Sequence, residues 1–196
     1  MKATRTYTMG SRAETVAATR ERITREAAAL FLQHAYEDVT LAAIAKASGV
    51  SHQTVLNHFE SKDGVVLAVA ELLKTETRSA RYEAAPGDVA GAVKALVGDY
   101  ERMGDANFRW AASDRFAILA ELLDEARQSH QQWLVAMFGA QLPASPAARR
   151  RAVSALHVAT DVYSWKLLRR DLGLSRTETE KTMATLVAAI LEGTTR

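Results

Sequence analysis

The chain has 196 residues with 25 basic and 23 acidic side chains, so its formal net charge at pH 7 is +2. This length allows one sizeable core, or a small domain beside a larger one. The absence of cysteine excludes disulfides, thiolate metal sites and cysteine nucleophiles. The five histidines form no i, i+4 pair, so we expect neither a metal site nor a cofactor. No secretory leader follows Met1 and no apolar run approaches the roughly 18 residues of a membrane span, which predicts a cytoplasmic protein.

The first part of the chain carries the basic excess. Residues 1–36 hold six basic and three acidic side chains, whereas the rest of the chain is slightly acidic. Because its beginning lacks apolar periodicity, residues 1–19 are predicted to be a flexible basic arm that can order on DNA.

The next segment predicts a helix followed by two short helices. Apolar residues recur at i, i+4, i+7 and i+8 over 23–31, which is typical of an amphipathic helix. In Leu41–Lys62 a tight turn at Ala47–Val50 separates the two short helices. Gly49 supplies the positive φ that this turn needs, and Thr40 and Ser51 are suited to cap the two helices.

The second short helix has two different faces. At 100° per residue, Val55, Leu56 and Phe59 share one sector, and the opposite sector holds the polar residues Gln53, Thr54, Asn57 and His58. A short helix with an apolar back and a neutral, hydrogen-bonding front suits the DNA major groove. The pattern predicts a helix-turn-helix; the alternative is an ordinary pair of antiparallel helices.

The rest of the chain also predicts helices. Their expected ranges are 61–82, 88–103, 107–111, 115–138, 146–172 and a final helix that begins at the capping box Ser175–Glu178. The predicted fold class is therefore all-α, with an N-terminal three-helix helix-turn-helix DNA-binding domain at 20–65 and a larger helical ligand-binding and dimerisation domain at 66–196.

Several motifs in this order resemble a known family. Residues 20–73 resemble the DNA-binding domain of tetracycline-repressor-type (TetR-type) transcriptional regulators. The resemblance rests on Ala28-Ala29-Leu30-Phe31, Ala35-Tyr36-Glu37-Asp38-Val39-Thr40, Ile44-Ala45-Lys46-Ala47-Ser48-Gly49-Val50-Ser51, Thr54 and His58-Phe59-Glu60-Ser61-Lys62. Three positions depart from the family pattern: Leu56 replaces the usual tyrosine and its phosphate contact, and Gln53 and Ala35 each replace a common glycine.

Residue roles on DNA follow from chemistry and from matching positions. The amides of Gln53 and Asn57 suit adenine N6 and N7, and Thr54 suits a base edge or a phosphate. The resemblance implies backbone contacts by Thr40, His58 and Lys62, and the two helix N-termini direct N–H groups toward phosphates. The candidate DNA-binding residues are Thr40, Ser51, His52, Gln53, Thr54, Asn57, His58 and Lys62. For each of them the alternative is plain exposure to solvent.

The last two predicted helices carry more apolar rows than one core needs. The resemblance implies that they pair with their copies as a four-helix dimer interface; the alternative is a fully buried central helix in a monomer. The candidate interface residues are Val153, Leu156, Tyr163, Leu167, Met183, Leu186, Val187 and Ile190.

The middle helices hold large apolar side chains with polar residues among them. The resemblance implies an enclosed small-molecule effector there, and simple core packing is the alternative. The candidate ligand-binding residues are Phe108, Trp110, Phe116, Trp133, Met137, His157 and Asp161.

Together these features predict a homodimeric repressor that leaves a pseudo-palindromic operator when a small-molecule effector binds. A second hypothesis is an interaction module that keeps the fold without sequence-specific DNA binding, supported only by Leu56. A third is a small all-helical enzyme, but the chain has no Gly-x-Ser-x-Gly motif and no phosphate-binding glycine loop, so we expect no enzyme.

Overall fold

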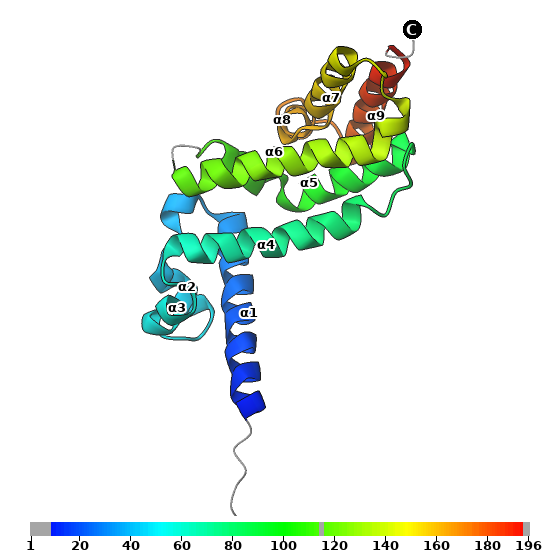
Figure 1. The fold of residues 1–196 in the computed structure, drawn as a ribbon. Helices are drawn as coiled ribbons and strands as arrows, with labels where there is room; N and C mark the ends of the chain where they lie inside the picture. The colour runs from blue at the N-terminus through cyan, green and yellow to red at the C-terminus, as the bar shows by residue number, and fades with distance from the viewer. Residues whose placement is uncertain (1–8, 114–115, 194–196) are drawn as a thin grey trace, which may run out of the picture. The chain divides into compact units, whose positions relative to one another are not determined.

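The computed structural model describes residues 9–113 and 116–193, and these residues form helices and turns without a strand. This confirms the all-α prediction. The chain divides into two compact units, one ending at Leu73 and the other beginning at Lys74, and Figure 1 traces the helices of each. No helix in the described residues is long and apolar enough to cross a membrane.

The N-terminal unit contains α1 (Met9–Gln33), the 3₁₀ turn η1 (Tyr36–Asp38), α2 (Leu41–Ala47), α3 (His52–Phe59) and the first part of α4 (Lys62–Arg81). Helix α2 packs against both α1 and α3. The core of the unit consists of apolar side chains from the four helices and from the residue after η1, namely Ile23, Ala27, Phe31, Val39, Ile44, Val55, Phe59, Val65 and Val69. The amphipathic pattern of the sequence thus marks the buried side of α1.

Helix α1 begins earlier than the sequence pattern suggested. The prediction of a flexible arm over 1–19 is wrong from Met9 onward, because residues 9–19 are helical. Stretch 13–18 contains strong helix formers, and the Thr19 hydroxyl donates to the Thr15 carbonyl at 2.9 Å. Good helix propensity therefore extends α1 without an apolar stripe. Residues 1–8 of the predicted arm lie outside the described residues.

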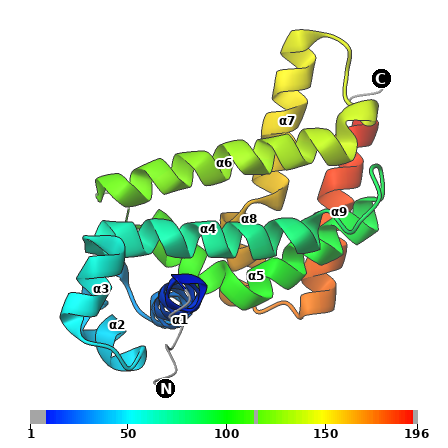
Figure 2. The same ribbon diagram turned by 60° about the horizontal axis from the view of Figure 1, so that its bottom comes forward.

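The C-terminal unit contains the end of α4, α5 (Val89–Ala111), α6 (Ala117–Phe138), the 3₁₀ turn η2 (Gly139–Gln141), α7 (Pro146–Thr160), α8 (Val162–Lys166), the π-helical turn η3 (Leu167–Asp171) and α9 (Arg176–Gly193). Helix α5 packs against α6, α8 and α9, while α7 packs against α6, α8 and α9 (Figure 2). The core between them includes the fully buried Leu96, Leu134, Phe138, Leu156, Trp165 and Met183.

Helix α5 is longer than predicted. The sequence suggested a break between Met103 and Asn107, where Gly104 and Asp105 weaken the helical pattern, but α5 is continuous to Ala111. A Cβ atom on Gly104 would lie 2.4 Å from Cζ3 of Trp165. Gly104 is therefore the place where a buried indole packs directly on the helix backbone, and not a helix end. The predicted helix start at residue 115 lies outside the described residues, and α6 begins at Ala117.

The predicted single helix over 146–172 is interrupted at Asp161. This residue has an extended backbone (φ −74°, ψ 155°), and its carboxylate accepts a hydrogen bond from the Tyr163 N–H at 2.9 Å. Asp161 thereby caps α8, a local bond that competes with continuation of α7. The apolar periodicity runs across this break, which is why it predicted one helix.

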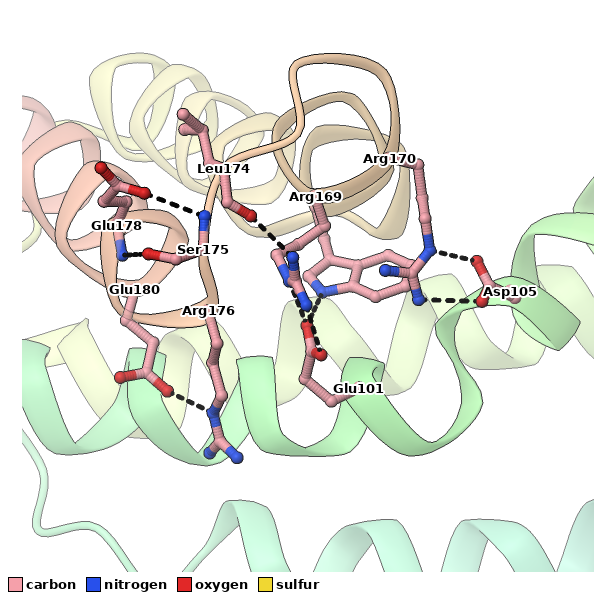
Figure 3. Close-up of polar contacts among 10 residues, drawn as sticks. Glu101, Asp105, Arg169, Arg170, Leu174, Ser175, Arg176, Glu178 and Glu180 are labelled. Carbon is pink, nitrogen blue, oxygen red and sulfur yellow. Dashed lines mark hydrogen bonds and ion pairs between the residues drawn. The ribbon is translucent and has the colours of Figure 1, made fainter.

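Two bidentate ion pairs hold η3 against α5 (Figure 3). The Arg169 guanidinium donates to Glu101 at 2.6 and 2.9 Å, and that of Arg170 donates to Asp105 at 2.9 Å from two nitrogens. The hydrogen bonds from Arg169, with the one from the Trp165 indole, lower the pKa of the Glu101 carboxyl. The predicted capping box at the start of α9 is also confirmed: Glu178 accepts from the Ser175 N–H, and Ser175 accepts from the Glu178 N–H.

Candidate functional site

The turn between α2 and α3 has the geometry that the sequence predicted. Gly49 has a φ of +64°, a left-handed conformation that favours glycine. The Ser48 hydroxyl donates to the Ile44 carbonyl at 2.7 Å, and the Val50 N–H donates to the Ala45 carbonyl at 3.0 Å. The turn is therefore closed by its own backbone and by one buried serine, which fixes the start of α3.

Both short helices are capped as predicted. The Thr40 hydroxyl oxygen accepts from the Ala43 N–H at 3.1 Å, and the Ser51 hydroxyl oxygen accepts from the Thr54 N–H at 3.0 Å. The hydroxyls of Ser51 and Thr54 also share a hydrogen bond at 2.8 Å. Thr54 is half-buried, and this hydrogen bond already engages its hydroxyl at the N-terminus of α3.

Helix α3 separates its residues by burial as the periodicity indicated. Val55 and Phe59 are buried, while His52, Gln53 and Asn57 are exposed. On the exposed side the Gln53 side-chain amide donates to the Asn57 side-chain oxygen at 3.0 Å. Leu56 and His58 are half-buried at the edges of this face. The arrangement leaves one side of α3 polar, neutral and accessible.

Lys62 has contacts within the protein that the sequence did not reveal. Its ammonium group donates to the Tyr36 carbonyl and lies 4.0 Å from the centre of the Tyr36 ring. The Tyr36 hydroxyl in turn donates to Asp63 at 2.8 Å. Burial lowers the pKa of Lys62, and burial together with the Asp63 hydrogen bond raises the pKa of Tyr36 to about 12. Lys62 thus joins η1 to the start of α4.

Arg20 is a residue of this unit that the sequence reasoning missed. Its guanidinium donates to the His58 carbonyl and lies 4.2 Å from the centre of the Phe59 ring. It thereby connects α1 to the C-terminal end of α3. Its spacing of three residues before the buried Ile23 is the sequence signal that places it on the inner side of α1.

The junction between α3 and α4 is tightly specified. Glu60 has a φ of +63°, a left-handed conformation that is unusual for a residue with a side chain. A Cβ on Gly64 would lie 2.0 Å from the Phe59 carbonyl oxygen, so no other residue fits there without a shift of the backbone. These two positions determine how the chain leaves α3.

The C-terminal unit brings together only some of the predicted ligand-binding residues. Trp133 and Met137 are buried in its core, and the Trp133 indole donates to the Arg81 carbonyl at 3.2 Å. The His157 imidazole lies 3.3 Å from the Asp161 carboxylate. Phe108 lies elsewhere, with its ring edge against Tyr163 at 5.4 Å between centroids. Trp110 and Phe116 are half-buried.

A buried polar network that the sequence did not predict surrounds His130. Its Nε2 lies 2.8 Å from the Thr160 hydroxyl, and its Nδ1 lies 3.3 Å from the Arg81 guanidinium. Because the Thr160 hydroxyl donates to the Leu156 carbonyl at 2.6 Å, it must accept from His130 Nε2. Arg81 also pairs with the buried carboxylate of Asp99 at 2.8 Å.

The electrostatics of this network keep His130 neutral. Burial, with the nearby Arg81 charge, lowers the pKa of His130 from an ordinary 6.5 to about 3. Asp161 is also partly buried, which raises its pKa, but hydrogen bonds from His157 and the Tyr163 N–H outweigh this and lower it overall. Within residues 9–113 and 116–193, no three His, Asp or Glu side chains gather closely enough to hold a metal ion.

The structure divides the predicted dimer-interface residues into three groups. Leu156, Met183 and Val187 are buried in the core of the chain itself, so their prediction as interface residues is wrong. Val153 and Ile190 are half-buried against that core. Tyr163, Leu167 and Leu186 are 49, 50 and 44% exposed. The error arose because 3-4-3-4 spacing marks an apolar face without saying whether the same chain or a copy covers it.

Comparison with known proteins agrees with this site. Residues 23–69 match the model of a family described as bacterial regulatory proteins, tetR family. No curated protein sequence matches the chain. A solved tetR-family transcriptional regulator from Streptomyces coelicolor has a similar structure, with a TM-score of 0.75, 17% identity, and coverage of 91% of this chain and 82% of that one.

Two further solved structures are similar. One is a transcriptional regulator from Rhodococcus sp. RHA1, with a TM-score of 0.67 and 19% identity over 89% of this chain and 96% of that one. The other is a gamma-butyrolactone receptor described as an ArpA-like protein, with a TM-score of 0.51 and 18% identity over 92% of this chain and 99% of that one. At these identities the structures show a shared fold.

The N-terminal unit therefore contains a helix-turn-helix, formed by α2 and α3. Residues 23–69, which include this helix-turn-helix, match the tetR family of bacterial regulatory proteins, and the chain shares the fold of solved TetR-family transcriptional regulators. This confirms the resemblance drawn from the sequence motifs.

Proposed function

We propose that the protein is a homodimeric repressor that binds a pseudo-palindromic operator and is released from it by a small-molecule effector. The observation that carries the proposal is the geometry of α3. Its start is capped by Ser51, its apolar side is buried through Val55 and Phe59, and its amide-bearing side is exposed. A helix built in this way can enter the major groove without uncovering its core.

Contacts to DNA divide into two kinds in this proposal. Gln53, Asn57 and His52 are exposed on α3 and read base edges. Phosphates are bound by the groups near the two helix N-termini, with Thr40, Ser51 and Thr54, and by His58 and Lys62 at the other end of α3. The Lys62 ammonium then exchanges its bond to the Tyr36 carbonyl for a phosphate oxygen.

The dimer forms through apolar side chains that the chain leaves exposed on α7, α8, η3 and α9. These are Val158, at 68% exposed, with Tyr163, Leu167 and Leu186. A twofold dimer presents the same surface on both copies and brings two reading helices to half-sites about 34–36 Å apart. This surface replaces the core residues that the sequence pattern had included.

The effector binds in the C-terminal unit, near the end of α7. His157 lies 3.3 Å from Asp161 there, and the His130 ring contacts both His157 and Trp133, so hydrogen-bonding groups adjoin an apolar wall, as a small-molecule site requires. Met137, the remaining member of the proposed site, lies one turn further along α6. The similar gamma-butyrolactone receptor supports a sensing role by its name. An effector that favours a conformation unsuited to the operator lowers DNA affinity by the ratio of its affinities for the two states. We propose no catalytic activity. Since the proposed target is operator DNA, we expect the protein in the cytoplasm.

Titration of the purified full chain against a fluorescent duplex of its own upstream region tests DNA binding. Affinity should fall on the order of 10³-fold or more between 50 and 200 mM salt if 6–10 phosphates are contacted. A scrambled duplex should bind more weakly at every salt concentration. Binding that is absent, or that does not respond to salt, would support an interaction module instead.

Sedimentation of single variants tests the dimer surface. Leu167→Glu adds a charge to the exposed row, so the protein should sediment as a monomer and lose operator affinity. The matched control is Val135→Glu, which changes an apolar residue of α6 that is 40% exposed and lies outside the proposed surface. If both variants remain dimeric, or both dissociate, the proposed surface is incorrect.

A further inference from the structure

The side-chain amides of Gln53 and Asn57 form a hydrogen-bonded pair on the exposed side of α3. The Gln53 Nε2 donates to the Asn57 Oδ1 at 3.0 Å, and both side chains are exposed. The two residues are one helical turn apart, at i and i+4, where side chains on a helix surface meet. Two amides that bind each other in this way hold each other in place before DNA arrives.

The bond leaves a defined set of hydrogen-bonding groups on this pair. It uses one Gln53 N–H and one lone pair of Asn57, which leaves the Gln53 carbonyl oxygen as a free acceptor, and the Asn57 amino group and the second Gln53 N–H as donors. If the oxygen and nitrogen atoms of both amides are exchanged by rotation of the side chains, the Asn57 carbonyl and the Gln53 amino group take these roles instead. Either way the pair offers one carbonyl oxygen and one amino group that take no part in the bond between them.

We propose that Gln53 and Asn57 read one base pair together, and that this base pair presents adenine in the major groove. This inference rests on the proposed operator binding. Adenine offers a donor at N6 and an acceptor at N7, which matches the free carbonyl oxygen and the free amino group of the pair. Guanine offers two acceptors, N7 and O6, so the acceptor of the amide pair would face O6 without a proton between them.

The alternative is that each amide reads a separate base pair alone. A lone glutamine or asparagine can bind adenine through both of its polar atoms, so the identity of the base does not distinguish the two cases. The position does. Two independent readers lose their preferences at two different base pairs, whereas a coupled reader loses its preference at one.

Selection of duplexes from a random library by the wild-type chain and by Q53A, N57A and the double variant tests this. The wild type should prefer adenine over guanine at the shared base pair by about tenfold to hundredfold. Each single variant should lose most of that preference at the same base pair, and the double variant should lose no more than either single one. K62A removes a cation and no base contact, so it should weaken all duplexes and keep the ratio.

The variant Q53E adds a second test. A carboxylate can still accept from the Asn57 amino group, but it offers only acceptors to the groove, so the preferred base should change from adenine to cytosine, whose N4 is a donor. Losses at two separate base pairs, or an unchanged preference in Q53E, would overturn the inference while operator binding stands. A wild-type chain that selects no sequence would overturn both the inference and the proposed function.

Discussion

Two glycines on α5 differ in what a methyl group would meet, and this difference can be measured. A Cβ on Gly104 would lie 2.4 and 2.6 Å from the Trp165 ring carbons Cζ3 and Cη2. A Cβ on Gly98 would meet only the end of the Arg176 side chain, at 3.3 Å. Gly104→Ala is therefore the perturbation, and Gly98→Ala is its control within the same helix.

The magnitude follows from two opposing effects. Alanine in place of glycine inside a helix contributes about 1 kcal/mol of stability, and this gain is the same for both variants. Trp165 is fully buried, its indole N–H donates to Glu101 at 3.0 Å, and the Arg170 guanidinium lies 4.7 Å from its ring centre. The ring cannot retreat without disturbing these contacts, and overpacking of this kind costs about 1–3 kcal/mol. We expect G98A to be up to about 1 kcal/mol more stable than the wild type, and G104A to be about 1–3 kcal/mol less stable than G98A.

Urea unfolding at a fixed protein concentration measures this difference, because the stability of the proposed dimer would depend on concentration. All three tryptophans, Trp110, Trp133 and Trp165, lie in the C-terminal unit, so their fluorescence reports on that unit. Circular dichroism at 222 nm provides a second signal that does not depend on the indole environment. If G104A proves as stable as G98A, the packing of Trp165 on α5 is not what requires a glycine at this position.

Four further predictions concern buried, ion-paired or capping groups. Lowering the pH from 7 to 5 should reduce the free energy of unfolding by about 2 kcal/mol, because His130 stays neutral when folded, with a pKa of about 3, and takes up a proton when unfolded. His130→Gln should remove this slope in urea titrations at the two pH values, and an unchanged slope would contradict the argument. Asp99→Ala leaves Arg81 without its buried partner and should cost about 3–5 kcal/mol by the same measurement. Asp105→Ala breaks an exposed pair and should cost at most about 1 kcal/mol. Ser51→Ala removes the cap of α3 and should destabilise that helix by about 1 kcal/mol, seen as faster hydrogen exchange of its amides.

Local signals predicted the helices and turns of the N-terminal unit well. The caps at Thr40 and Ser51, the glycine turn at Gly49 and the buried side of α3 all depend on a few neighbouring residues, and all have the expected geometry. The contacts of Lys62 with Tyr36 could not be predicted, because the two residues are 26 positions apart and only the folded chain brings them together.

The C-terminal unit was less predictable, because its features depend on contacts between helices. A glycine within a helical pattern predicts a helix end, yet α5 continues through Gly104. Trp165 packs on the backbone there, and only the folded chain shows this contact. The apolar spacing of α7 does not distinguish Leu156, which is buried in the core, from Val158, which is exposed. The polar network of His130 joins residues from four helices, and no sequence spacing indicates such a network.

The junction that ends α3 has a practical consequence for any attempt to change which DNA sequence the proposed reading helix binds. At this junction the Phe59 side chain is buried, the Glu60 backbone is left-handed, and a Cβ atom on Gly64 would clash with the backbone. A randomised library gains nothing from diversity at these positions, since most variants there will misfold. The side chains of His52, Gln53 and Asn57 are exposed, so these three positions can be varied while the helix that presents them stays folded.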